Sequence, residues 1–175
     1  MYLLSLDQST TNTGLAQWKI NGDEAELIQF GKYNLKKGKG KEHYPYTFQP
    51  LVDKINQFDY NEVVLEEVYA GGNKQTFKQL VRLQYQIIME CYMKDIDFKV
   101  VYPTSWQATM RKLFNIKEWI SKKSSVQIVR DLLHIPDDEK ISDDMAESIL
   151  IGIHYLIKEK GIEFKNISFN KAERI

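Results

Sequence analysis

The pattern of apolar residues at the start of the chain predicts three β-strands. Residues 2–7 are mainly apolar, as in a buried strand, and residues 14–20 alternate apolar and polar side chains as a second strand does. Asn21 and Gly22 form a strong signal for a two-residue turn before a third apolar run over 25–30. The beginning of the chain is therefore expected to fold as an antiparallel meander.

Helical and strand patterns alternate after this meander. Short apolar strands are expected over 62–67 and 98–102. The expected order is three antiparallel strands and then two strands that are separated by helices. This order predicts an α/β domain with a mixed five-stranded sheet, in which the first strand is central and helices cover the faces. The expected helices cover 45–58, 74–94, a short stretch from Pro103, 121–133, and a last stretch that starts at Ser142 or Asp143 and stops at Gly161.

The helix expected over 74–94 has an apolar arc wider than one sheet face can bury. Part of this arc is therefore expected to contact a second copy of the chain, with Leu83 as one exposed member. Cys91, the only cysteine, falls in the same helix and is interpreted as a small core side chain. Neither a disulfide nor a thiolate zinc site is therefore expected.

Length and charge narrow the possible classes of protein. The 175 residues suffice for one domain, taken to span 1–175. No apolar run approaches the roughly 20 residues that span a bilayer, and no signal-peptide pattern is seen, so a cytoplasmic protein is expected.

Net charge is zero, but basic residues cluster in two segments that suit a phosphate backbone, although the first could also be a solvated loop. The candidate phosphate contacts are Lys37, Lys39 and Lys41 in the first segment and Arg111, Lys112 and Lys122 in the second.

Carboxylates gather at the ends of the apolar segments. Asp7 closes the first strand, Glu66 and Glu67 close the strand over 62–67, and three acids open the last helix. Ionised carboxylates beside a core are costly unless a cation pairs with them, and oxygen ligands of this kind suit Mg²⁺ or Mn²⁺. The pattern therefore favours a metal site with chemistry on phosphate, with solvated strand-end and cap acids as the alternative.

Residue spacing selects the better candidates in the last helix. Asp144 and Glu147 are three residues apart and share one side of the helix, whereas Asp143 points about 100° away from Asp144. Asp143 is interpreted as an N-cap or first-turn acid, with a metal-binding role left open. The three histidines are interpreted as structural: His43, His134 and His154.

Strand alternation separates the two glutamates of the 62–67 segment. Successive side chains of a strand face opposite sides of the sheet, so only one of Glu66 and Glu67 can reach a common site. Glu66 is preferred because it shares a side with Val64.

Four segments of the chain together resemble a known family. In order and spacing they are similar to the RuvC-type Holliday junction resolvases of the RNase H-like superfamily, and the similarity covers nearly the whole chain. The segments are Leu4–Gly14 (LSLDQSTTNTG), Val64–Tyr69 (VLEEVY), Lys123–Gln127 (KSSVQ) and Asp144–Ile149 (DMAESI).

The resemblance implies an RNase H-like nuclease, a crossover junction endodeoxyribonuclease, that cuts branched DNA symmetrically as a homodimer. It implies two Mg²⁺ ions per active site, with Mn²⁺ as a substitute, and hydrolysis that leaves 5′-phosphates. Lys123 falls on the family's catalytic-region lysine, and Tyr69 falls on an aromatic residue that stacks against DNA near the crossover. The implied metal-binding and catalytic acids are Asp7, Glu66, Asp144 and Glu147.

The chain departs from the family pattern at three points. Ser9 stands where the family has glycine, and the last motif ends in Glu147 rather than Asp, which changes the expected metal spacing. A basic residue usual near 106–108 is absent, and Arg111 or Lys112 is a possible substitute. These features resemble the phage and poxvirus branches more than the bacterial housekeeping enzyme, and a phage-encoded protein would work in the host cytoplasm.

Two other functions fit parts of the sequence. Asp7 followed by Ser, Thr and Gly14 also resembles the phosphate loop of actin-like or sugar-kinase phosphotransferases, which bind ATP between two domains. A non-catalytic junction-binding protein of the same fold is the second alternative. The sequence does not separate four-way junctions from forks, flaps or RNA as substrates.

Overall fold

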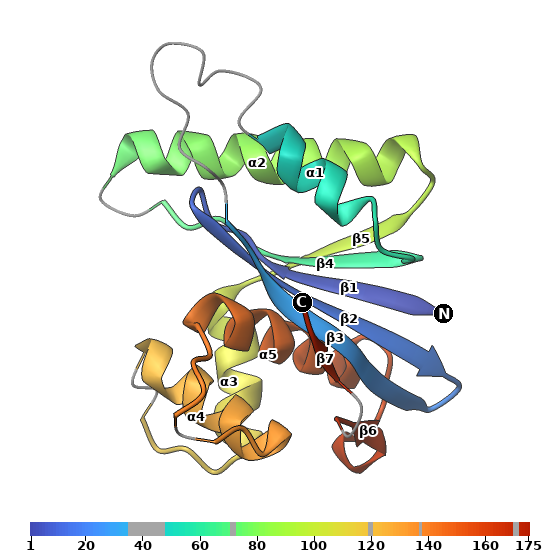
Figure 1. The fold of residues 1–175 in the computed structure, drawn as a ribbon, viewed down its shortest axis with the longest axis vertical. Helices are drawn as coiled ribbons and strands as arrows, with labels where there is room; N and C mark the ends of the chain where they lie inside the picture. Colours follow the sequence, from blue (N-terminus) through green and yellow to red (C-terminus); the bar gives the residue numbers. More distant parts are fainter. Residues whose placement is uncertain (35–47, 71–72, 119–120, 137, 170–171) are drawn as a thin grey trace.

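A mixed β-sheet forms the centre of the protein in a computed structural model, which describes residues 1–34, 48–70, 73–118, 121–136, 138–169 and 172–175 (Figure 1). The strand order is β5-β4-β1-β2-β3-β6, and β7 also pairs with β3. β1 is antiparallel to β2 and parallel to β4, as predicted for a central first strand. The five main strands are β1 (Tyr2–Asp7), β2 (Asn12–Asn21), β3 (Glu24–Asn34), β4 (Glu62–Glu66) and β5 (Asp97–Val101).

The hairpin between β2 and β3 turns one residue later than its sequence signal indicated. Asn21 pairs with Glu24, so the turn residues are Gly22 and Asp23. Gly22 has a φ of 63°, in the left-handed region that glycine adopts without a steric cost. The Asn-Gly pair marks the hairpin, but Asn21 is still paired with the opposite strand, so the turn begins at Gly22.

Two very short strands add to the far edge of the sheet. β6 (Ile167–Ser168) and β7 (Glu173–Arg174) each pair in parallel with β3. The sequence analysis did not predict them, because two residues are too few to show an alternating pattern.

Helices cover both faces of the sheet (Figure 1). Side chains alternate between the faces: Leu4 and Leu6 pack on the side of α1 and α2, whereas Leu3 and Ser5 face α5. Asp7, two residues after Ser5 in β1, therefore lies on the same side of the sheet as α5. The helices are α1 (Gln49–Ile55) and α2 (Lys74–Met93) on one face, and α3 (Pro103–Leu113), α4 (Ser121–Leu133) and α5 (Asp143–Lys158) on the other.

The helix ends follow ordinary capping chemistry. The Ser142 hydroxyl accepts from the Met145 backbone N–H at 3.3 Å and caps α5, so Asp143 is a first-turn acid rather than the N-cap. Pro103 stands in the first turn of α3. The helix expected over 45–58 is shorter: α1 begins at Gln49, and residues 45–47 lie outside the described part.

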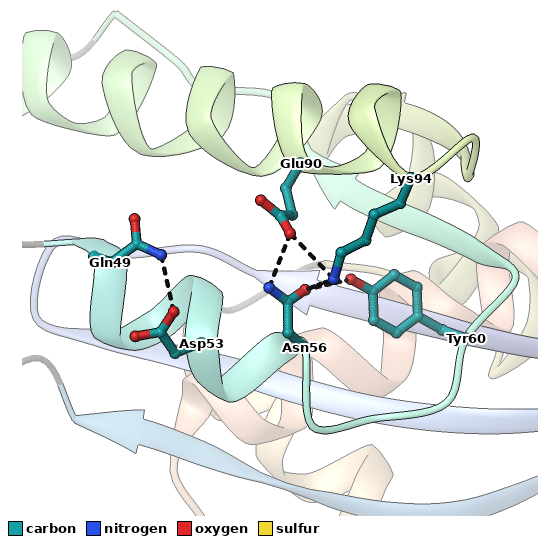
Figure 2. Close-up of polar contacts among 6 residues, drawn as sticks. All are labelled: Gln49, Asp53, Asn56, Tyr60, Glu90 and Lys94. Carbon is teal, nitrogen blue, oxygen red and sulfur yellow. Dashed lines mark hydrogen bonds and ion pairs between the residues drawn. The ribbon is translucent and has the colours of Figure 1, made fainter.

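A polar network joins the two helices α1 and α2 (Figure 2). Asn56, at the end of α1, donates to Glu90 Oε1 at 2.9 Å and accepts from Lys94 Nζ at 2.6 Å. Tyr60 donates to the Asn56 side-chain oxygen at 3.2 Å, and burial together with nearby Cys91 and Glu90 raises the pKa of Tyr60 to about 12. The contacts of Asn56 with Glu90 and Lys94 fix the end of α1 on α2, whereas the hydrogen bond from Gln49 to Asp53 at 2.8 Å lies within α1.

The wide apolar arc of α2 is divided between the sheet and solvent. Leu83, Ile87 and Cys91 repeat every four residues and are buried against the sheet. The prediction that Leu83 is exposed was wrong, since none of its surface is accessible. The exposed apolar face of α2 consists instead of Val81, Tyr85, Tyr92 and Met93. No helix in the described structure is long and apolar enough to cross a membrane.

Candidate active site

Asp7 and Glu66 lie side by side at the carboxyl ends of two parallel strands. Leu6 of β1 pairs with Leu65 of β4, and the next residue of each strand is the acid. Asp7 faces α5 because Ser5, on the same side of β1, donates its hydroxyl to the Ser148 carbonyl oxygen of α5 at 2.7 Å. Asp7 is buried, with 7% of its surface exposed, so its carboxylate is largely withdrawn from water.

Glu66 and Glu67 face different surroundings, as strand alternation predicted. The indole N–H of Trp106 on α3 donates to Glu66 Oε1 at 2.6 Å, which places Glu66 on the α5 face together with Val64. The Glu67 side chain instead accepts from the Val68 backbone N–H at 3.0 Å. Burial raises the pKa of Glu66, and the hydrogen bond from Trp106 lowers it in part.

The first turn of α5 lies directly on the end of β1 and β2. Gly14 pairs with Asp7 across these strands, and a Cβ at Gly14 would come within 1.8 Å of the Asp144 carbonyl oxygen. Only a residue without a side chain permits this approach. Because of this contact, the α5 backbone at Asp144 lies against the residue paired with Asp7.

Glu147 lies one helical turn further along α5. Its Oε1 accepts a hydrogen bond from the Ser125 hydroxyl of α4 at 3.1 Å. The structure thus brings the four predicted acids to one end of the sheet: two come from strand ends, and two come from the start of α5. Which of them bind metal stays a prediction.

The donor set fits a hard divalent cation by its chemistry, since all four candidates are carboxylates. Glu66 in particular is half-buried and forms no ion pair within the part of the chain that the structure describes. The side chains are not drawn together, however: among the described residues, no three Asp, Glu, His or Cys side chains are close enough to bind one ion.

The histidines fit their structural interpretation where they are described. His154 Nδ1 lies 2.9 Å from the Thr109 hydroxyl and joins α5 to α3. Burial and the nearby Lys158 lower the pKa of His154. His134 follows α4 with a φ of 51°, and His43 lies outside the described residues.

The basic candidates are less well placed than the acids. Lys123 is exposed on α4, but it is two residues from Ser125 and hence about 200° away around the helix. Position 122, three residues before Ser125, shares its side of the helix, although the Lys122 side chain is not described. Arg111 donates to the Lys117 carbonyl oxygen at 2.9 Å, and Lys112 is exposed. The other predicted lysines, Lys37, Lys39 and Lys41, lie outside the described residues.

Exposed aromatic residues lie near the acids. Tyr69 is 80% exposed three residues beyond Glu66, so it is not a core residue. Tyr102, 62% exposed, follows Val101, the strand partner of Glu66. Sequence reasoning missed Tyr102, although an aromatic residue directly after a strand that neighbours a candidate catalytic strand was a usable signal.

Sequence reasoning also missed three neutral side chains that contact Glu66. Besides Trp106, the side-chain amides of Gln8 and Gln84 donate to the Glu66 backbone carbonyl oxygen at 2.5 and 2.9 Å. Gln8 follows Asp7 directly in the sequence, whereas nothing local to Gln84 or Trp106 indicates a contact with Glu66.

The fold is that of RuvC and other Holliday junction resolvases of known structure. Thermus thermophilus RuvC in complex with a Holliday junction substrate superposes with a TM-score of 0.66 at 13% identity, covering 93% of this chain and 98% of that one. The yeast mitochondrial Holliday junction resolvase gives 0.64 at 16% identity, over 88% and 77%. The fowlpox virus resolvase bound to Holliday junction DNA gives 0.62 at 17% identity, over 93% and 100%.

By sequence, the chain is a distant relative of the crossover junction endodeoxyribonucleases RuvC over nearly its whole length. The RuvC protein of Dictyoglomus thermophilum is 24% identical over 166 residues, which are 92% of this chain and 99% of that protein. The RuvC protein of Nitratiruptor sp. is 22% identical over 152 residues, which are 85% and 94% of the two chains. No family model matches the chain.

Proposed function

We propose that this protein is a metal-dependent endonuclease that resolves four-way DNA junctions by phosphodiester hydrolysis. One observation carries the proposal: Asp7 and Glu66 end adjacent parallel strands, and the α5 turn with Asp144 lies against the strand residue paired with Asp7. This arrangement occurs in a chain that shares its fold and distant sequence similarity with crossover junction endodeoxyribonucleases.

Asp7, Glu66, Asp144 and Glu147 would hold two Mg²⁺ ions, or Mn²⁺ in their place. Bound divalent metal supplies an activated water and stabilises the leaving 3′-oxygen, so the products carry 5′-phosphates. The protein's own part is to keep Asp7 nearly free of water and to fix the backbone and side chain of Glu66. Glu147 would exchange its hydrogen bond with Ser125 for the metal.

The surroundings of the acids supply candidate contacts to DNA. Tyr69 is exposed beyond Glu66 and would stack on a base near the branch point. The family resemblance alone supports a role for Lys123 in offsetting charge on the scissile phosphate, since Lys123 lies on the side of α4 away from Ser125. Arg111, Lys112 and Lys122 would contact the phosphate backbone. Lys37, Lys39 and Lys41 would extend this basic surface.

Symmetrical cutting of two strands requires two active sites, and the exposed face of α2 would supply the dimer contact. Val81, Tyr85, Tyr92 and Met93 are 42–77% exposed on this helix, and exposed apolar side chains gathered on one element are typical of an interaction surface. The buried Leu83 no longer belongs to the proposed interface.

The branch of the family is a finer part of the proposal. Ser9 and Glu147, the last acid of the last motif, support a phage- or poxvirus-like enzyme that works in the host cytoplasm. The fowlpox resolvase does not separate the branches, because Thermus thermophilus RuvC superposes with a higher TM-score. The bacterial RuvC relatives support the wider family rather than this branch.

The central experiment compares cleavage of labelled four-way, three-way and linear DNA in Mg²⁺. We expect paired cuts in the four-way junction. Asp7→Asn should abolish cleavage and retain junction binding, because it removes a metal ligand and no phosphate contact. Glu66→Gln should act in the same way, and Glu67→Gln is the matched control that should cleave nearly normally. Normal turnover by Asp7→Asn would exclude the proposed site, and tight binding without cleavage by the wild type would indicate a non-catalytic junction-binding protein.

A further inference from the structure

We infer that Trp106 is a positioning residue for Glu66: its indole N–H fixes the carboxylate for metal binding without contributing charge. The inference rests on the proposed metal-dependent function, and it adds a residue that the carboxylate pattern does not contain. Trp106 touches neither metal nor DNA in this scheme. It acts only through Glu66.

The inference starts from the hydrogen bond between Trp106 and Glu66. Trp106 is completely buried, and its Nε1 lies 2.6 Å from Glu66 Oε1. An indole N–H is a donor only, so the hydrogen bond orients the carboxylate and uses a single oxygen of it. Among the described residues, no other side-chain hydrogen bond to the Glu66 carboxylate is found.

The helix that carries Trp106 is fixed at two further points. Pro103 begins α3 only one residue after the end of β5, the strand beside Glu66. Thr109, nearly one turn beyond Trp106, contacts His154 of α5 at 2.9 Å. The indole is thus held between the sheet and α5, and both ends of the hydrogen bond belong to rigid elements.

The backbone of Glu66 is held by two more neutral donors. The Gln8 and Gln84 amides both donate to its carbonyl oxygen. Both side chains are at least nine-tenths buried, and the Gln8 amide oxygen has no hydrogen-bond partner in the described structure. The backbone of Glu66 is therefore held by two uncharged side chains, one that follows β1 and one on α2.

These hydrogen-bond donors to Glu66 are uncharged, which suits a residue that binds a metal ion. A lysine or arginine paired with Glu66 would compete with a metal ion for the same charge. Indole and amide N–H groups orient the residue and leave its negative charge available.

The test compares two buried tryptophans that each lose one N–H. Trp106→Phe removes the hydrogen bond to Glu66. Trp18→Phe is the matched control, because Trp18 is also completely buried in the same core and donates to the Ser5 hydroxyl at 3.0 Å. Mn²⁺ binding is measured by titration calorimetry without DNA, and thermal unfolding is measured without metal. If Trp106→Phe does not fold, 3-benzothienylalanine at position 106 keeps the ring shape and removes only the N–H.

We expect Trp106→Phe to weaken Mn²⁺ binding about tenfold, the loss typical of a residue that orients a metal ligand, while Trp18→Phe leaves it nearly unchanged. In single-turnover cleavage, Trp106→Phe should need more Mg²⁺ and recover most of its rate at saturation. Equal losses of Mn²⁺ affinity in both variants, or no loss in Trp106→Phe, would overturn the inference. A selective loss of Mn²⁺ affinity in a protein that cleaves no DNA would support the positioning role and refute the proposed nuclease function.

Discussion

Replacement of Gly14 by alanine should slow cleavage strongly in a protein that still folds. A Cβ at this position would lie 1.8 Å from the Asp144 carbonyl oxygen and 2.4 Å from its carbonyl carbon. Both atoms belong to the backbone, so no side-chain rotation relieves the clash. Even a tight contact of 3.0 Å requires the start of α5 to move by about 1.2 Å relative to β2.

The expected losses of folding free energy and of cleavage rate follow from this displacement. Overpacking of a well-packed core costs about 1–3 kcal/mol of folding free energy. A misplacement of about 1 Å in a catalytic constellation costs about 10²-fold in rate. The start of α5 carries Asp144 and Glu147, so Gly14→Ala should fold with reduced stability and cleave about a hundredfold more slowly.

Gly22→Ala provides a control with a similar cost in stability. Gly22 has a φ of 63° and nothing within 4 Å of a Cβ, so alanine there is strained by about 1–2 kcal/mol and disturbs no neighbour. Both variants are compared by urea unfolding, single-turnover cleavage of a four-way junction, and junction binding in Ca²⁺. Cleavage by folded Gly14→Ala within about threefold of Gly22→Ala would refute the inference that α5 must lie this close for catalysis.

The remaining predictions concern assembly and DNA contacts. Tyr85→Glu should yield monomers in sedimentation that nick junctions without paired cuts, whereas Tyr85→Phe should remain dimeric; a monomeric wild type would exclude the interface. Lys123→Ala should lower the single-turnover rate more than junction affinity, and equal losses would make Lys123 a backbone contact only. Joint replacement of Lys37, Lys39 and Lys41 by Gln should flatten the slope of log affinity against log salt by up to about 3 units, and an unchanged slope would remove them from the interface.

The sequence predicts the sheet and the acids because both leave local signals. The alternation within 62–67 correctly assigned Glu66 to the side of Val64, and the i, i+3 spacing placed Asp144 and Glu147 on one helix. The predicted central position of β1 also agrees with the sheet order. Each of these features depends only on neighbours along one strand or one helix.

Features that depend on distant segments were missed or misjudged. Leu83 was expected to be exposed because a wide apolar arc does not show which part of it meets the sheet. Trp106 is 40 residues from Glu66 in the sequence, and a neutral donor to a carboxylate leaves no charge pattern. The sequence likewise does not show which side of α4 faces the acids. That side is identified only by the hydrogen bond from Ser125 to Glu147.

The environment of Cys91 makes the protein ready for site-specific labelling. It is the only cysteine, it is 1% exposed, and burial with the nearby Glu90 raises its pKa to about 11. At neutral pH its thiolate is about one part in ten thousand, and the thiolate is the form that reacts with maleimides. A cysteine introduced at Tyr69 would therefore take up a fluorophore selectively in the wild-type background, and its emission could report DNA approaching the strand ends in real time.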